Sequence, residues 1–238
     1  MIKYLNVILF AGTLVMNYLA NALPLNNKTT GELSDSFPNL FTPAGITFSI
    51  WGIIYLLLVV YCVIQFTTSH QSAVSDIGWL FGVSCVLNAL WIVFWHYGRL
   101  PASLIVMAGL LVSLIYINIY IRELPFGIIK AAFGVYLGWI CIAAIANVTA
   151  LLVYYNWNGF GVSHETWTII MISIGALVAA VTIYRLANPF IGLSVVWAFT
   201  GIILKRHEDY RSIVITAAIA ILFVTIVTIY AFFRPARS

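Results

Sequence analysis

The sequence predicts an all-α integral membrane protein, and three observations lead to that class. Hydrophobic residues make up 63% of the 238 residues and charged residues only 8%, and the mean hydropathy is +1.05. Such a chain lacks the polar surface that a water-soluble globule of this size requires. Its apolar residues also fall in runs that are long enough to cross about 30 Å of hydrocarbon as helices.

Eight apolar runs of about 20 residues each predict eight transmembrane helices. In chain order they cover residues 4–23, 45–66, 78–97, 101–121, 131–153, 167–184, 187–204 and 212–233. The first run ends in a sequence that resembles a signal-peptide cleavage site, but it is long for a signal peptide, so we expect a retained helix. The sixth and seventh runs are short and closely spaced. Seven spans are therefore the alternative to eight.

Two polar stretches divide the apolar runs into groups. Residues 24–44 are long enough to fold over one end of a helix bundle, which makes them a candidate lid; a simple tether is the alternative. Residues 154–166 are rich in Gly and Asn. This second stretch predicts a boundary near residue 158, with a five-helix unit at 1–157 and a three-helix extension at 158–238.

Charged and metal-binding residues give little support to catalysis. No predicted span has an Asp, Glu, Lys or Arg near its middle that could act as an acid, a base or an ion carrier. The histidines fall at helix ends or in loops without the spacing of metal ligands. The basic residues form no stripe, which argues against nucleic-acid binding. The sequence thus predicts no catalytic residue and no metal ligand.

Three of the predicted helices carry aromatic side chains at spacings of three and four, which places them on one face of each helix. Two of these helices also carry an amide near the middle of the span. The set comprises Phe48, Trp51, Tyr55, Asn88, Trp91, Trp95, Tyr136, Trp139, Ala143 and Asn147. An apolar pocket with a few converging polar groups suits a small molecule. Helix packing with interhelical hydrogen bonds is the alternative.

These residues, in this order, resemble the translocator protein or tryptophan-rich sensory protein (TspO/MBR) family. The resemblance rests on three stretches of the sequence. They are Phe41-Thr42-Pro43 with Gly45, Phe48, Trp51 and Tyr55; Leu87 to Trp91 with Phe94, Trp95 and Arg99; and Tyr136, Trp139, Ala143 and Asn147. The resemblance covers residues 1–155 and leaves the last three predicted helices as a C-terminal extension.

The resemblance implies a five-helix bundle, often dimeric, with a cavity under the first loop that binds planar hydrophobic molecules such as porphyrins, haem and sterols. Carried over by position, the lining residues would be Trp51, Asn88, Trp139, Ala143 and Asn147, with Pro43 and Phe48 at the rim; the aromatic stripes add Tyr55 and Trp91. The sequence departs from the family pattern at Ala44, Ile46 and Ile50, where Pro, Trp and Pro are usual. The departure at Ile46 removes an aromatic residue from the rim.

We therefore expect a multi-pass protein of a bacterial cell membrane or an organelle membrane that binds a planar hydrophobic molecule for sensing or transport. Its expected partners are membrane lipid, that small ligand and a second copy of the chain. No cofactor is expected apart from porphyrin or haem as the ligand. One alternative is an enzyme that degrades a tetrapyrrole in light, with Trp51 or Trp139 supplying an electron. The other is a structural or transport component whose aromatic stripes only pack.

Overall fold

A computed structural model describes residues 1–22 and 25–233, and within those ranges all regular structure is helical. The short helices are η1 (Leu25–Asn27), α2 (Thr30–Asp35), η2 (Gly45–Ser49) and η3 (Gly159–Gly161). The long helices are α1 (Ile2–Asn21), α3 (Ile50–Ile64), α4 (Gln71–His96), α5 (Leu100–Tyr120), α6 (Ile128–Tyr154), α7 (His164–Leu186), α8 (Phe190–Arg206) and α9 (Arg211–Phe233).

Each of the eight predicted spans corresponds to one of the long helices. In the described ranges, seven helical segments are long and apolar enough to cross a membrane. The eighth helix, α8, has 17 residues, which gives a length of about 26 Å at the α-helical rise of 1.5 Å per residue. Its length therefore falls at the lower limit for a membrane-spanning helix. The all-α membrane fold that the sequence predicts is confirmed.

The second and third spans differ most from the prediction. The third span begins at Gln71 instead of residue 78, because a helix can continue beyond the hydrocarbon layer into polar sequence. The second span opens with the 3₁₀ helix η2 and becomes an α-helix at Ile50. This narrower first segment sets the position of Phe48 at the end of the bundle.

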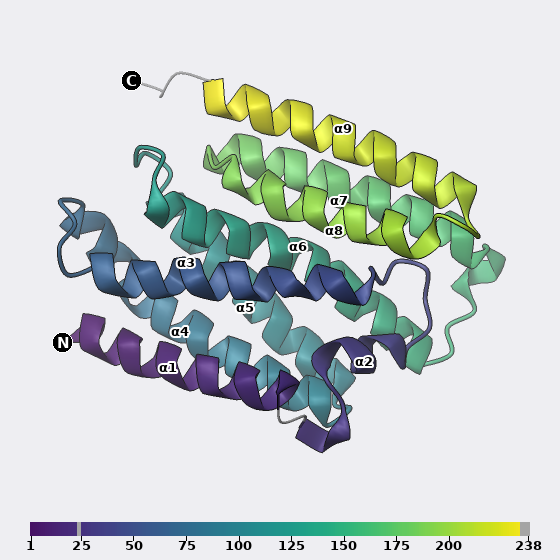
Figure 1. Ribbon diagram of the computed structural model, residues 1–238, viewed down its shortest axis with the longest axis horizontal. Helices are drawn as coiled ribbons and strands as arrows, with labels where there is room; N and C mark the ends of the chain where they lie inside the picture. The colour runs from purple at the N-terminus through teal and green to yellow at the C-terminus, as the bar shows by residue number, and fades with distance from the viewer. Residues whose placement is uncertain (23–24, 234–238) are drawn as a thin grey trace.

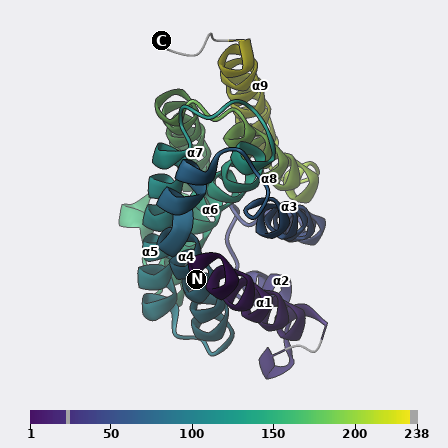
Figure 2. The same ribbon diagram turned by 90° about the vertical axis from the view of Figure 1, so that its left-hand side faces the viewer.

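The long helices lie side by side with roughly parallel axes, with α1 and α4 toward one edge and α9 at the other (Figure 1). Seen from the end, α6 lies near the centre of the array (Figure 2). It contacts α3, α5, α7 and α8, while α1 packs on α4 and α9 packs on α7 and α8. Helix α6 therefore joins the first five spans to the last three.

Small residues on α6 allow α8 to approach it closely. A Cβ atom added to Gly138 would collide with the backbone oxygen of Ile191 and with Ser194 Oγ, and one added to Gly134 would lie 2.6 Å from Asn188 Oδ1. The buried Asn188 donates from Nδ2 to Asn118 Oδ1 at 2.7 Å. Close backbone approach and a buried amide pair thus hold the last three spans against α6.

Candidate functional site

A small cavity lies between α2, η2, α3, α4 and α6, and we call it the inner chamber. Its volume is about 40 Å³. Seven of the nine ligand-binding residues expected from the sequence line it. The complete lining is Thr30, Ser34, Pro43, Phe48, Trp51, Trp91, Trp95, Trp139, Ile142, Ala143, Ala146 and Asn147. Residues from five elements far apart in the chain therefore meet around one apolar space.

A second cavity, the lateral cleft, adjoins the inner chamber between α1 and α3. Its volume is about 290 Å³. Its lining residues are Leu14, Asn17, Tyr18, Asn21, Thr30, Phe48, Trp51, Gly52 and Tyr55. The structure therefore places Tyr55, the eighth expected residue, in the cleft. Thr30, Phe48 and Trp51 line both cavities, so these three side chains form the wall between them.

The indole of Trp51 lies at the centre of the aromatic cluster. It stacks on Tyr55 with ring centroids 5.4 Å apart and an interplanar angle of 18°, and its edge contacts with Trp139 have a centroid distance of 6.2 Å and an angle of 81°. Phe48 also meets Trp139 edge to face, at 5.9 Å. Such perpendicular and offset contacts are the favoured geometries of aromatic pairs. The chamber walls are thus flat rings held by one another.

Asn88 lies outside both cavities. It accepts a hydrogen bond from Asn17 Nδ2 at 3.0 Å and donates to the Tyr136 hydroxyl at 2.8 Å. The side chain links α1, α4 and α6 through these two bonds. The structure thus separates Asn88 from the other expected site residues, since its visible role is helix packing behind the aromatic cluster.

Three buried N–H groups on the chamber side chains have no hydrogen-bond partner within residues 1–22 and 25–233. They are Trp91 Nε1, Trp139 Nε1 and Asn147 Nδ2. The other end of the Asn147 amide accepts from Ser103 Oγ at 3.2 Å. Leaving a buried donor unpaired costs about 1 to 3 kcal/mol. Side chains that line the chamber therefore carry N–H donors without a hydrogen-bond partner.

Residues 25–44 of the first loop lie over the chamber at the end of the bundle, where α2 contributes Thr30 and Ser34 to its wall. The buried ring of His96 holds α2 in place, with Nε2 3.1 Å from Thr30 Oγ1 and Nδ1 3.0 Å from the Leu25 carbonyl. Trp95 Nε1 adds a longer bond to the Thr30 carbonyl at 3.4 Å. The C-terminal end of α4 therefore fixes the first half of the loop.

A capping box sets where α2 begins. The Thr29 hydroxyl accepts from the Glu32 backbone N–H, and the Glu32 carboxylate accepts from the Thr29 backbone N–H at 2.7 Å. These two bonds satisfy donors that a helix N-terminus leaves free. The bond from the Thr29 backbone is the main reason that the pKa of Glu32 is lowered.

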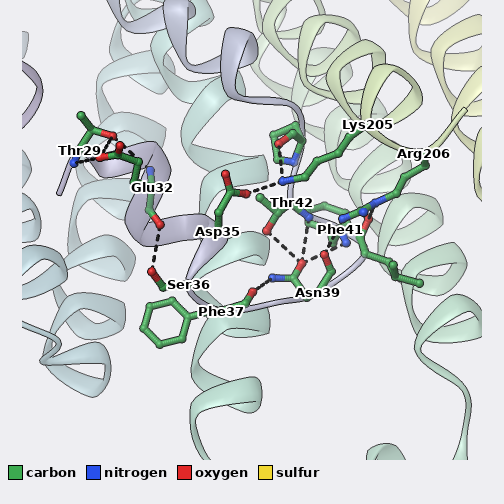
Figure 3. A network of polar contacts seen from close by, with 12 residues as sticks. Thr29, Glu32, Asp35, Ser36, Phe37, Asn39, Phe41, Thr42, Lys205 and Arg206 are labelled. Atoms are coloured by element: carbon green, nitrogen blue, oxygen red, sulfur yellow. Dashed lines mark hydrogen bonds and ion pairs between the residues drawn. The ribbon is translucent and has the colours of Figure 1, made fainter.

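The second half of loop 24–44 is bound by α8. Asn39 Oδ1 accepts from the backbone N–H groups of Phe41 and Thr42 at 3.0 and 2.9 Å, which folds the loop tightly (Figure 3). Arg206 donates from Nη2 to the Asn39 carbonyl at 2.7 Å, and Lys205 pairs with Asp35 (Figure 3). The extension thus contacts the loop that covers the chamber.

The chamber contains five residues that the expected site did not include. They are Thr30, Ser34, Trp95, Ile142 and Ala146. Trp95 already belongs to the aromatic stripe that helical spacing predicts on α4, although it was not among the expected ligand-binding residues. Ala146 follows Ala143 by three residues, so the same spacing could have identified it. No local signal in the sequence shows that a turn of the first loop lines the cavity.

One of three comparisons with known proteins gives a match, and it covers most of the chain. The family model described as TSPO-like protein matches residues 3–230. Searches of curated proteins and of solved structures find no match. The family match includes the last three spans as well as the first five. The chain therefore belongs to the TSPO-like protein family and is a multi-pass integral membrane protein.

Proposed function

We propose that this protein binds a planar hydrophobic small molecule, of tetrapyrrole or sterol type, in the inner chamber, for sensing or transport. The observation that carries the proposal is the set of three unpartnered N–H donors among side chains with large apolar rings. A ligand with an apolar face and a carbonyl or carboxylate oxygen would satisfy both features. Trp51 and Trp139 would contact its face, and Asn147 would donate to its oxygen.

Ligand entry would require the chamber to join the lateral cleft. The chamber volume of about 40 Å³ is far below the roughly 300 to 1,000 Å³ of typical small-molecule sites. The adjoining cleft has about 290 Å³. Rotation of Phe48 and Trp51, both half-buried, would merge the two spaces. The merged site would reach the size of a ligand pocket without any helix moving.

Titration with protoporphyrin tests this function through quenching of tryptophan fluorescence. We expect saturable quenching by the wild-type protein and a Kd about tenfold higher for Asn147→Ala, since one hydrogen bond is worth about 1.4 kcal/mol in this setting. Trp139→Phe should also weaken binding. Trp79→Phe is the matched control, because Trp79 is 65% exposed and lies in neither cavity.

Two results would contradict ligand binding in the chamber. One is the absence of saturable quenching with the wild-type protein. The other is a set of chamber variants that lose thermal stability but keep the wild-type Kd, which would favour the structural role of the aromatic stripes.

Light-dependent degradation of a tetrapyrrole is the second candidate function. A chain of indoles favours it: Trp51 lies 6.2 Å from Trp139 and 6.4 Å from Trp91, and Trp91 stacks on Trp95 at 5.7 Å. Aromatic rings this close could pass an electron from the chamber toward the end of the bundle. Illumination of the porphyrin complex separates the candidates, because only the enzyme would give a new product whose rate of formation falls in Trp51→Phe.

A further inference from the structure

A third cavity lies outside the site described above, where α6 ends and α7 begins. We call it the junction cavity, and its volume is about 350 Å³. This volume is in the range of small-molecule sites. Its lining consists of Pro38, Asn39, Leu40, Phe41, Val148, Thr149, Leu152, Val153, Asn156, Trp157, Gly159, His164, Trp167, Thr168 and Met171. Both the first five spans and the extension contribute to its walls.

The aromatic wall of the junction cavity is fixed in position. Trp167 donates from Nε1 to the Gly159 carbonyl at 2.9 Å, and its ring lies 5.1 Å from that of Trp157. Gly159 has a φ of +64°, and a Cβ atom there would lie 3.0 Å from Trp167 Nε1. Glycine is therefore needed both for the backbone turn and for the close approach of the indole. The cavity has an apolar side that forms without a ligand.

A fourth cavity, the basic cavity, adjoins the junction cavity and has a volume of about 330 Å³. The two share Pro38, Asn39, Leu40 and His164. The remaining residues of the basic cavity are Ser34, Asp35, Phe37, Thr42, Lys205, Arg206 and Tyr210. Asp35 is the one carboxylate in this lining, and it pairs with Lys205. An apolar space and a space with cationic groups thus meet along one loop segment.

The guanidinium of Arg206 retains hydrogen-bonding capacity. It donates from Nε to the Leu40 carbonyl at 3.1 Å and from Nη2 to the Asn39 carbonyl at 2.7 Å. A guanidinium has five N–H donors, so these bonds leave others for a ligand. Within the described ranges no ion pair joins Arg206 to a carboxylate. Asp209 and Asp35 lie near enough to attract its charge but do not pair with it directly.

We infer that these two cavities form a second binding site, which takes an amphipathic anion. The apolar body of the ligand would lie against Trp157 and Trp167 in the junction cavity, and its carboxylate or phosphate would lie beside Arg206 in the basic cavity. Charge complementarity selects an anion over a neutral or cationic amphiphile. Neither cavity contains Trp51, Trp139 or Asn147, so the inference does not depend on the proposed function.

Quenching of tryptophan fluorescence by 9,10-dibromostearate tests the site, because bromine quenches indoles that it contacts. The full-length protein in detergent should show a saturable phase. The uncharged alcohol with the same brominated chain is the matched control, and we expect it to bind at least tenfold more weakly. Equal binding of the acid and the alcohol would identify a plain lipid-facing groove and overturn the inference.

Two substitutions at Arg206 separate the charge from the shape of the loop. Arg206→Gln should raise the Kd of the brominated acid about tenfold, the effect of losing a charge-assisted contact. Arg206→Lys keeps the charge but loses the two hydrogen bonds of the guanidinium to the carbonyls of Asn39 and Leu40. Its Kd for the brominated acid should stay within about threefold of the wild-type value. Equal loss in both variants would assign the effect to the loop and overturn the inference.

Further measurements identify the source of the anion and exclude the inner chamber. Thr149→Phe, which places a ring in the junction cavity, should abolish the saturable phase, and Asn147→Ala should leave it unchanged. In lipid nanodiscs, competition by phosphatidylglycerol but not phosphatidylcholine would indicate a membrane phospholipid as the occupant. Competition by neither lipid would indicate a free amphipathic acid. Loss of the phase in Asn147→Ala, with Thr149→Phe unaffected, would place the fatty acid in the chamber and contradict the second site.

Discussion

The two faces of α6 differ in how completely they are filled. Toward α8, Gly134 and Gly138 bring the helix into contact with Asn188 and with the backbone of Ile191. Toward α3 and α4, Ala143 and its neighbours border the inner chamber. Both faces of α6 carry small residues. Residue size alone therefore does not determine whether a neighbouring helix packs closely against α6 or leaves a cavity beside it.

The partner of each small residue accounts for the difference. On the α8 face the opposing groups are a backbone carbonyl and short polar side chains, which fit into the notch that glycine leaves. On the chamber face the opposing groups are rigid rings that already contact one another edge to face. In the ligand-free structure these ring contacts keep the side chains out of the space beside Ala143. The α8 face is therefore closely packed, whereas the chamber face leaves a small empty space.

Among the substitutions that test this difference between the two faces, Gly138→Ala should lower the stability of the protein most. The added Cβ atom would collide with the backbone oxygen of Ile191, and a backbone group on a packed helix cannot turn aside. We expect destabilisation by about 3 kcal/mol, at the upper end for overpacked sites. Thermal unfolding in detergent measures this loss of stability. Unfolding is monitored by the reaction of a thiol-specific label with Cys62, Cys85 and Cys141, which are buried in the folded protein.

Gly12→Ala on α1 is the control, because it shows how replacing glycine by alanine changes stability through helix propensity alone. No atom lies within 4 Å of a Cβ placed at Gly12, so only helix propensity changes, which favours alanine by about 1 kcal/mol. Equal thermal stability of the Gly138 and Gly12 variants would show that the α6–α8 contact is not tight.

Two asparagine-to-leucine substitutions should change the stability by an intermediate amount. The substitution at Asn118, near the contact of α6 with α8, should lower the stability, whereas the substitution at Asn147 in the chamber should not. Asn118 bonds to the carbonyls of Leu114 and Phe133 and accepts from Asn188, whereas Asn147 Nδ2 has no partner in the described part of the chain. Asn118→Leu should destabilise the protein by about 1 to 3 kcal/mol. Asn147→Leu should leave the ligand-free stability unchanged or raise it.

Chemical or thermal unfolding of both leucine variants, each without ligand, checks this difference. Equal destabilisation would mean that the Asn147 amide is as well satisfied as that of Asn118. The unused donors would then no longer support a ligand in the chamber.

Sequence patterns predicted the fold more completely than the site. The positions of the spans follow from the lengths of the apolar runs, because the thickness of the hydrocarbon layer sets the minimum length of a crossing helix. Polar sequence beyond that layer carries no such constraint, which is why the start of α4 at Gln71 was missed. The boundary at residue 158 between two domains stays a prediction.

Helical spacing gave the face of each aromatic residue but not its neighbours. The faces that it predicted for Trp51, Trp91 and Trp139 all border the inner chamber. It could not distinguish Asn88 from Asn147, because both are mid-helix amides on such faces. What separates them is the presence of Asn17 and Tyr136 beside Asn88, which depends on how α1 and α6 pack against α4.

Acidification should produce the smallest effect, confined to the loop over the chamber. The pKa of Glu32 lies below its usual value of 4.5. The largest cause is the hydrogen bond that its carboxylate accepts from the backbone N–H of Thr29. The bond therefore stabilises α2 fully above pH 4.5, and this contribution is lost as the pH falls through the lowered pKa of the folded state. Hydrogen exchange of residues 29–36, corrected for intrinsic rates, should show less protection at about pH 3 than at about pH 6.

Glu32→Gln is the control, because its side-chain oxygen can accept the same bond but cannot titrate. The protection of residues 29–36 in this variant should not change over this pH range. Protection that falls equally in both proteins would exclude Glu32 as the cause. Constant protection in the wild type would show that the contacts of α4 and α8, rather than the capping box, hold the loop over the chamber.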